Sequence, residues 1–257
     1  MGFRWSGKTV FITGASSGIG RALAVALGRR GASLGILARR ADELEKTAGE
    51  IKAAGGRALA CPADVCDLDA MRRAADSVRE HLGPIDVMVA NAGVGGTKPA
   101  ADLEPEDVAR VINTNVIGAV NTVTAVLPSM LARRSGHLVA ISSLAAYRGL
   151  PRSGAYCASK AAVSAYFESL RLDLRTSGVT VTTIHPGFIK TPMTAGRRTR
   201  MPYLMELDEA VEKIIGAIEG RRTSYAFPWQ LATIVRLLRP LPDALYDRIL
   251  ARSRIRE

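Results

Sequence analysis

Residues 8–20 of the chain read KTVFITGASSGIG. The apolar and β-branched residues at the start of this stretch predict a buried strand over residues 8–13, followed by a turn rich in glycine and serine. Glycines let backbone N–H groups come close to a phosphate, and the helix that follows offers its positive N-terminal end. A tight strand-to-helix junction without a ligand is the simpler alternative. The residues expected to contact a dinucleotide here are Gly14, Ser16, Ser17, Gly18, Ile19 and Gly20.

The same alternation of strand and helix continues along the chain. Further short apolar runs lie at 33–38, 57–61, 86–90, 137–141, 179–184 and 225–227. Amphipathic stretches separate them at 19–30, 41–54, 68–82, 105–134, 155–177 and 208–219. Apolar strands separated by helices are typical of a parallel sheet covered on both faces. We therefore expect one doubly wound α/β domain over residues 1–257, with a helical C-terminal extension over 228–257 and ligands at the carboxyl ends of the strands.

The composition is that of a folded globular protein. Of 257 residues, 47% are hydrophobic and 23% are charged, which excludes a disordered chain. The three cysteines, Cys61, Cys66 and Cys157, are too few and odd in number for a disulfide-built secreted scaffold. Charged Lys8 and a glycine-rich stretch follow the first residues, where a signal peptide would have an apolar core, so we expect a cytoplasmic protein.

The net charge of +11 suggests nucleic acid or an anionic surface as a binding partner. The basic residues do not form a dense run interleaved with aromatic residues, so we expect no nucleic-acid partner. Their tightest group is Arg197, Arg198 and Arg200. Residues 111–132 carry no charge over a length that would span a bilayer. Asparagines and a proline within them favour a buried helix of a soluble protein instead.

The end of the second predicted strand indicates which dinucleotide binds. An NAD site needs a carboxylate for the ribose hydroxyls about 20 residues beyond the glycines. Here Ala38 takes that place and is followed by Arg39 and Arg40. Two cations without a carboxylate favour a 2′-phosphate, so the sequence predicts NADP(H) over NAD(H). The alternative, two solvated arginines at a helix start, does not account for Ala38.

A tyrosine and a lysine lie one helical turn apart at Tyr156 and Lys160. At this spacing the two side chains share one face of the predicted helix. A free tyrosine has a pKa near 10, too high for acid–base work at neutral pH. A cation about 4 Å away, at an effective dielectric of about 20, supplies about 4 kcal/mol, or roughly three pKa units. The pair therefore predicts a phenol that exchanges protons near working pH.

At this point the chain resembles the short-chain dehydrogenase/reductase family, in its compact single-domain branch, over about residues 7–227. Thr13–Gly20 looks like the family's cofactor turn, and Ala90-Asn91-Ala92-Gly93 looks like its N-A-G motif. Asn115-Val116-Ile117-Gly118 is similar to its N-V-x-G motif. Ser143 stands at the family's usual interval before Tyr156, and Pro186-Gly187 with Thr191 is similar to its P-G-x-x-x-T segment. Five motifs in the family's order make the resemblance specific.

The resemblance implies a catalytic tetrad of Asn115, Ser143, Tyr156 and Lys160. Ser143 would hydrogen-bond the substrate carbonyl oxygen while Tyr156 donates the proton. Lys160 would lower the pKa of the tyrosine and bind the nicotinamide ribose, and Asn115 would hold a water that links Lys160 to solvent. For Asn115, an asparagine that only satisfies backbone groups is the alternative. Ser142 is expected to point to the other face of its strand.

The family's remaining cofactor contacts transfer to residues at the ends of the later strands. They are Asp64, Val65, Asn91, Ala92, Gly93, Pro186, Gly187, Ile189 and Thr191, beside Tyr156 and Lys160 themselves. Asp64 would face the adenine, and Ile189 and Thr191 would meet the nicotinamide carboxamide. His137 and His185 are expected to be structural, and no spacing of histidine, cysteine and aspartate suggests a metal site.

The function implied is an NADP(H)-dependent oxidoreductase that acts on a carbonyl or secondary alcohol. A catalytically idle cofactor sensor or scaffold in the same fold is the alternative from another class. A sugar-nucleotide epimerase or dehydratase would need a longer substrate domain. Residues 191–207 lie where the family has its substrate lid, and their mixture of apolar side chains with three arginines favours a lipophilic substrate while leaving room for an anionic group.

Two expectations concern assembly and the tail. The long uncharged segment 111–132 cannot bury every face within one layer, and in the family this helix pairs across a two-fold axis, so we expect a homodimer or homotetramer. In the tail, Trp229, Leu231, Ile234, Val235 and Leu238 recur at helical spacing beside several arginines. Such a stripe is able to touch an anionic membrane surface. Prolines break the tail into short helices, which favours a cover over the substrate cleft or a subunit contact.

Overall fold

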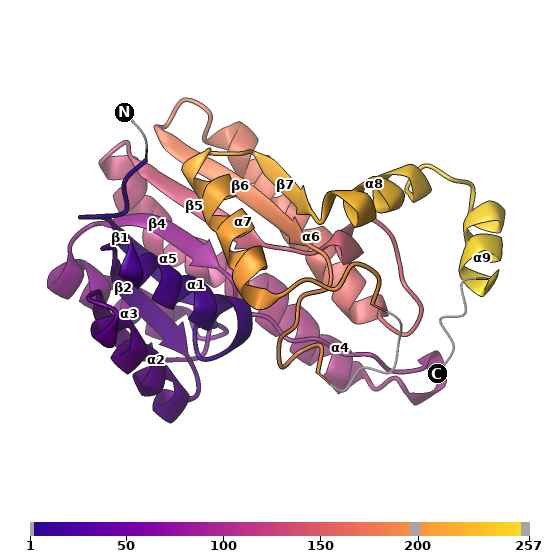
Figure 1. Ribbon diagram of the computed structural model, residues 1–257, viewed down its shortest axis with the longest axis horizontal. Coiled ribbons are helices and arrows are strands. Elements are labelled where there is room, and N and C mark those ends of the chain that lie inside the picture. Colours follow the sequence, from indigo (N-terminus) through magenta and orange to yellow (C-terminus); the bar gives the residue numbers. More distant parts are fainter. Residues whose placement is uncertain (1–2, 196–200, 253–257) are drawn as a thin grey trace.

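The computed structural model describes residues 3–195 and 201–252, so Arg197, Arg198 and Arg200 lie outside the described residues. Within these residues, seven parallel strands form one sheet in the order β3-β2-β1-β4-β5-β6-β7 (Figure 1). The strands are β1 (Thr9–Thr13), β2 (Ser33–Ala38), β3 (Arg57–Pro62), β4 (Ile85–Ala90), β5 (Gly136–Ile141), β6 (Val179–Pro186) and β7 (Ser224–Phe227). The doubly wound sheet predicted from the sequence is confirmed.

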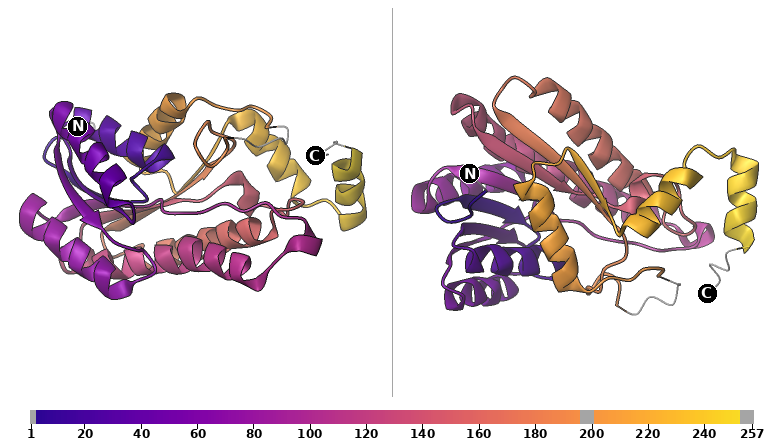
Figure 2. Two further views of the ribbon diagram at one scale, coloured as in Figure 1. Left: turned by 90° about the horizontal axis from the view of Figure 1, so that it is seen from below. Right: turned by 45° about the horizontal axis from the view of Figure 1, so that its top comes forward.

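Helices cover both faces of the sheet (Figure 2). One layer holds α1 (Gly18–Arg29), α2 (Ala41–Ala53) and α7 (Leu207–Glu219), and the other holds α3 (Leu68–Leu82), α5 (Gly118–Ala132) and α6 (Gly154–Asp173). Successive strand side chains point to opposite faces. In β1, Val10 and Ile12 accordingly join the first core and Phe11 joins the second. Both faces are therefore buried, which explains why the strands are apolar throughout.

The order of the strands reverses at the centre of the sheet. From β1 the chain moves outward through β2 and β3, and it then returns to place β4 on the other side of β1. Loops leave in opposite directions at this point, so a crevice opens beyond the carboxyl ends of β1 and β4. The sheet thus positions a ligand site between the turn after β1 and the loop after β4.

The helix predicted over 105–134 is interrupted by one π-helical turn. It consists of α4 (Pro105–Ile112), the π turn η2 (Asn113–Ile117) and α5. By length and composition, 105–132 is the one candidate membrane span within the part of the chain that the structure describes. Half of its most apolar window is buried in the protein, where α5 packs on α3 and β4. That packing is the one expected of a core helix.

The described part of the C-terminal extension, residues 228–252, forms two short helices beyond the sheet, α8 (Trp229–Leu238) and α9 (Asp243–Arg252) (Figure 1). Leu231 and Ala232 of α8 are buried, whereas the Trp229 side chain is 72% exposed. The sequence placed Trp229 in the apolar stripe of the tail, and the structure corrects this. Of the stripe residues, Leu231 turns into the protein and Val235 and Leu238 are half-buried, whereas Trp229, at the first position of α8, and Ile234 are exposed.

Candidate active site

A cavity of about 1530 Å³ opens at the carboxyl ends of the strands. It runs from the glycine-rich turn after β1 to the side chains of α8 and α9. Pockets for one drug-sized ligand measure roughly 300–1,000 Å³, so this cavity has room for two molecules side by side. Of the site residues predicted from the sequence, all but Gly20 and Asn115 line it.

The glycine-rich turn is held by close contacts with the loop after β4. Gly14 has φ +70°, and a Cβ there would lie 2.7 Å from the Cα of Ala92. The Asn91 side chain donates hydrogen bonds to the main-chain oxygens of Thr13 and Gly14, at 3.0 and 3.2 Å. A Cβ on Gly20 would collide with that Asn91 side chain and with the Gly14 oxygen. Gly20 therefore lies behind the turn, where it lets α1 pack, and it does not line the cavity; its cofactor contact stays a prediction.

Arg40 lies across the start of α1. Its Nη2 donates to Ser16 Oγ at 3.0 Å and to Ser17 Oγ at 2.9 Å. Ser17 is the N-cap of α1, yet its side chain makes no capping hydrogen bond to the helix. The N-terminus of α1, whose first N–H groups lack partners within the helix, thus lies beside a cluster of two hydroxyls and a guanidinium. Such a cluster is suited to bind a phosphate.

The ends of β2 and β3 complete this part of the cavity. Ala38 is buried at the end of β2, so no carboxylate stands there. Arg39 Nη1 lies 3.6 Å from Asp64 Oδ2, and Asp64 Oδ1 accepts a hydrogen bond from the Cys66 N–H at 2.9 Å. Val65 packs against the glycine that begins α5, since a Cβ on Gly118 would lie 2.5 Å from Val65 Cγ2. The loop after β3 is thereby fixed at the rim of the cavity.

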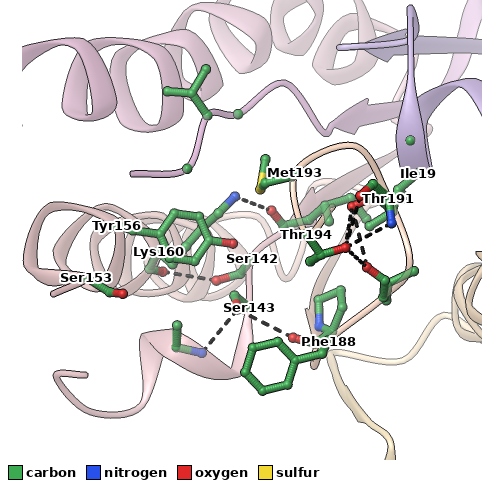
Figure 3. A pocket seen from close by; sticks show the side chains of 18 of the residues that line it. Ile19, Ser142, Ser143, Ser153, Tyr156, Lys160, Phe188, Thr191, Met193 and Thr194 are labelled. Atoms are coloured by element: carbon green, nitrogen blue, oxygen red, sulfur yellow. Dashed lines mark hydrogen bonds between the residues drawn. The ribbon is translucent and has the colours of Figure 1, made fainter. Parts of the chain in front are cut away.

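Tyr156 and Lys160 extend from the same face of α6 into the cavity (Figure 3). The Lys160 nitrogen lies 5.8 Å from the centre of the Tyr156 ring. It also donates a 2.9 Å hydrogen bond to the main-chain oxygen of Ile141, at the end of β5. Burial of the ammonium group lowers the pKa of Lys160 to about 8. The side chain is thus still protonated at neutral pH and places its charge beside the tyrosine.

The two serines after β5 have different surroundings. Ser143 Oγ accepts a hydrogen bond from the Ala145 N–H at 3.1 Å, which holds it at the N-cap of the short helix η3 (Leu144–Ala146) (Figure 3). Ser142 Oγ donates to the main-chain oxygen of Lys160 at 3.0 Å and lies 2.8 Å from Ser164 Oγ. Ser142 therefore fastens β5 to α6, and Ser143 offers its hydroxyl near Tyr156.

Asn115 lies in the π turn and not at the cavity wall. Its Oδ1 accepts from the Val94 N–H at 2.7 Å, and its Nδ2 donates to the Val94 oxygen and to Ser159 Oγ at 3.0 and 2.9 Å. A Cβ on Gly93 would lie 3.2 Å from Asn115 Oδ1 and 3.5 Å from Lys160 Nζ. Asn115 thus ties the loop after β4 to α6 directly behind Lys160. The π turn gives the side chain this direction, as such turns do at other functional sites.

The segment after β6 forms the opposite wall. The Gly187 N–H donates to the main-chain oxygen of Phe227 at 2.7 Å, which ties this wall to β7. Ile189 is buried and pairs with Met205 in an isolated bridge. The Thr191 N–H donates to Thr194 Oγ1 at 3.0 Å. Ile189 and Thr191 therefore stand on an ordered turn that faces the glycine-rich turn.

Several cavity residues were missed in the sequence. Arg148, Leu150 and Ser153 lie between Ser143 and Tyr156, and Phe188 directly follows the proline and glycine after β6. Position within these intervals was the only signal for them. The tail contributes a larger group to the cavity wall: Leu231, Ile234, Val235, Leu238, Tyr246, Ile249 and Leu250. The described parts of α8 and α9 are therefore walls of the cavity.

The residues fit a nicotinamide dinucleotide. Glycines with no room for a Cβ bring backbone close to the start of α1, and Arg39 and Arg40 stand at the rim. Tyr156 and Lys160 lie at the other end of the same cavity. Within 3–195 and 201–252, no group of three or more histidine, cysteine, aspartate or glutamate side chains is placed to hold a metal ion. Tyr156 and Lys160, at one end of this cavity, offer proton transfer beside a bound organic cofactor.

Comparison with known proteins agrees with this geometry. A family model described as short chain dehydrogenase matches residues 8–202. An uncharacterized oxidoreductase of Myxococcus xanthus (strain DK1622) is 45% identical over 247 residues, covering 96% of this chain and 98% of the relative.

Two solved structures are similar over most of their length. A short chain dehydrogenase/reductase from Burkholderia phymatum in complex with NAD has a TM-score of 0.85 and 27% identity, over 91% of this chain and 94% of that one. An alcohol dehydrogenase from the archaeon Thermococcus sibiricus complexed with 5-hydroxy-NADP has a TM-score of 0.77 and 29% identity, over 86% and 95%. This chain belongs to the short-chain dehydrogenase/reductase family and is an NAD(P)-dependent oxidoreductase.

Proposed function

We propose that the protein reduces the carbonyl group of a lipophilic substrate with NADPH, and oxidises the corresponding alcohol with NADP⁺, with Tyr156 as the acid and base. The arrangement that carries this proposal is the meeting of Tyr156, Lys160 and Ser143 at the centre of the cavity, between the glycine-rich turn and an apolar wall. The cofactor, when bound, supplies the hydride to the carbonyl carbon.

The protein's own residues supply the proton and orient the oxygen. In reduction, Tyr156 gives its phenolic proton to the carbonyl oxygen, and Ser143 donates a hydrogen bond to the same oxygen. The protonated Lys160 favours the phenolate that remains, because opposite charges in a buried site attract strongly. Asn115 supports this step indirectly, since it fixes the loop and the helix on either side of Lys160.

The preference for NADP(H) rests on the groups beside the turn. Ala38 leaves no carboxylate at the end of β2, and Arg40 with Ser16 and Ser17 forms a cluster of donors for an anion. Asp64 offsets part of the charge of Arg39 but is oriented by the Cys66 N–H. Arg40 is thus the main ligand for a 2′-phosphate in this proposal, with Arg39 as the second cation.

The substrate class follows from the far end of the cavity. Beyond Tyr156 the side chains are mostly apolar: Leu150, Phe188, Met193, Leu231, Ile234, Val235, Leu238, Tyr246 and Ile249. Such a wall gains binding free energy from each methylene it removes from water. A ketone or aldehyde with a long or bulky apolar part therefore fits better than a small polar one.

The test is a panel of carbonyl compounds that differ in apolar length, each assayed by the loss of NADPH absorbance and repeated with NADH. We expect turnover with NADPH, with KM falling as the apolar part grows. Turnover that favours small hydroxylated carbonyl compounds would refute the substrate class. Turnover with NADH at higher kcat/KM than with NADPH would refute the cofactor.

A further inference from the structure

We propose that Arg148 is a positioning residue that fixes the apolar end of the substrate cavity, by fastening α8 and α9 to the loop between Ser143 and Tyr156. The consequence for substrates rests on the proposed function. The fastening itself does not, because it is a property of the folded chain without ligand.

Arg148 gathers main-chain carbonyl groups at the C-terminus of α8 and just beyond it. Its Nη1 donates to the main-chain oxygens of Leu238, Arg239 and Leu241, at 3.0, 3.0 and 2.7 Å. Carbonyl groups at the C-terminus of a helix lack partners within the helix, and a cation there also complements the helix dipole. Only 17% of the Arg148 side chain is exposed, so water does not readily replace it.

The same guanidinium also holds the start of α9. Its Nη2 donates to Asp243 Oδ1 at 2.6 Å, and its central carbon lies 4.0 Å from the centre of the Tyr246 ring. The Tyr246 hydroxyl donates to the main-chain oxygen of Gly149 at 2.7 Å. Planarity and several donors make arginine suited to this double role, which a lysine cannot fill.

The anchored helices form the cavity wall next to the catalytic segment. Leu231 and Val235 of α8 and Ile249 of α9 line the cavity. Arg148 itself belongs to the loop that begins after Ser143 and ends where α6 brings Tyr156 into place. One segment therefore carries both the catalytic hydroxyl groups and the fastening of the wall. The distance between the catalytic hydroxyl groups and the wall formed by α8 and α9 therefore depends on Arg148. This distance sets the length of the apolar chain that a substrate can have.

Hydrogen–deuterium exchange of the full chain without ligand tests the fastening. Arg148→Met keeps an apolar stem and removes all four hydrogen bonds, and we expect amides of α8 and α9 to exchange about tenfold faster or more. Arg248→Met, which removes an exposed arginine of α9, is the matched control and is expected to leave exchange unchanged. Unchanged exchange in Arg148→Met, or an equal increase in the control, would overturn the proposal.

Kinetics test the consequence for substrates. In Arg148→Met we expect KM for a long straight-chain ketone to rise about tenfold, with kcat within about twofold and KM for cyclohexanone unchanged. Tyr246→Phe, which loses only the hydrogen bond to Gly149, is expected to show a smaller rise in KM for the long ketone alone. It replaces Arg148→Met as the test variant if Arg148→Met folds poorly. Equal loss for both ketones would mean a general structural role and would overturn the proposal. If the wild type reduces no carbonyl compound, the proposed function fails, and the exchange experiment still decides the role of Arg148.

Discussion

Lys160 donates its buried hydrogen bond to the main-chain oxygen of Ile141 at 2.9 Å, so the catalytic helix and the end of β5 meet at an ammonium group. Only 6% of Lys160 is exposed, and burial lowers its pKa to about 8 from an ordinary 10.5. Keeping the Lys160 ammonium group charged in this buried position therefore lowers the free energy of unfolding. Strained or desolvated groups of this kind are retained where activity requires them.

Lys160→Met is expected to abolish activity while it stabilises the fold. The lowered pKa corresponds to about 3 kcal/mol of destabilisation of the wild type below pH 8, which the variant avoids. The variant also loses the hydrogen bond to Ile141, which costs it about 1 kcal/mol. The folded wild type binds fewer protons than the unfolded chain between pH 8 and 10.5, so its stability rises with pH there. The advantage of the variant should shrink over that range in urea unfolding. Lys46→Met on α2 is the exposed control, and a Lys160→Met variant less stable than wild type at neutral pH would contradict this account.

Arg40→Ala is expected to lower the preference for NADPH over NADH by about tenfold or more, because a charge-assisted hydrogen bond to phosphate is lost. Arg39→Ala should have a smaller effect, since Asp64 already neutralises part of its charge. The measurement is kcat/KM with both cofactors. Lys46→Ala removes a positive charge of α2 that does not line the cavity, and its ratio should equal that of wild type. An unchanged ratio in Arg40→Ala would remove the basis for the cofactor proposal.

Two buried histidines predict a loss of stability in acid. Burial lowers the pKa of His137 and of His185 to about 4. As the pH falls from 6.5 toward 4, the unfolded chain takes up protons that the folded chain does not, so the free energy of unfolding decreases. At pH 5 the loss should be about 2 kcal/mol for each histidine. His137→Gln should lose about that much less stability than wild type between pH 7 and pH 5, measured by urea unfolding. A His137→Gln variant that loses as much stability as wild type over this range would refute the assignment.

We expect a homodimer or homotetramer in solution. Large apolar side chains are exposed at Ile117 and Leu131, along the π turn and α5, and at Leu172 on the neighbouring α6. Exposed apolar residues on adjacent helices favour burial against a second copy of the chain. Light scattering of the purified protein at micromolar concentration measures the mass, and replacing Ile117 and Leu172 together by aspartate should lower it. A monomeric mass for wild type would contradict the expectation.

The sequence predicted the sheet well because local pattern alone determines it. Each apolar run became a strand, since both faces of a parallel sheet are buried. Tyr156 and Lys160 could be paired from helical spacing, whereas the choice of Ser143 over Ser142 came from the family interval. In the structure both serines line the cavity, but Ser142 donates to the backbone of α6 whereas Ser143 caps η3, and the choice of Ser143 stays a prediction.

Other features depend on contacts that no local pattern records. Arg148 binds groups 90 to 95 residues away, and nothing in its neighbours distinguishes it from a solvated arginine. The π turn at Asn115 lies within one uninterrupted apolar stretch, from which the sequence predicts a single helix over 105–134. Gly20 belongs to the glycine pattern, but only the position of Asn91 shows that it packs behind the turn.

The central claim is that Tyr156 transfers the proton in a carbonyl reduction, and Tyr156→Phe tests it most directly. The measurement is single-turnover oxidation of bound NADPH by the best ketone of the panel, together with NADPH affinity by fluorescence titration. We predict that the variant binds NADPH within about threefold of wild type and loses at least about a hundredfold in rate, since one proton donor contributes roughly 10²–10⁴-fold. A variant that keeps most of the wild-type rate would contradict the mechanism.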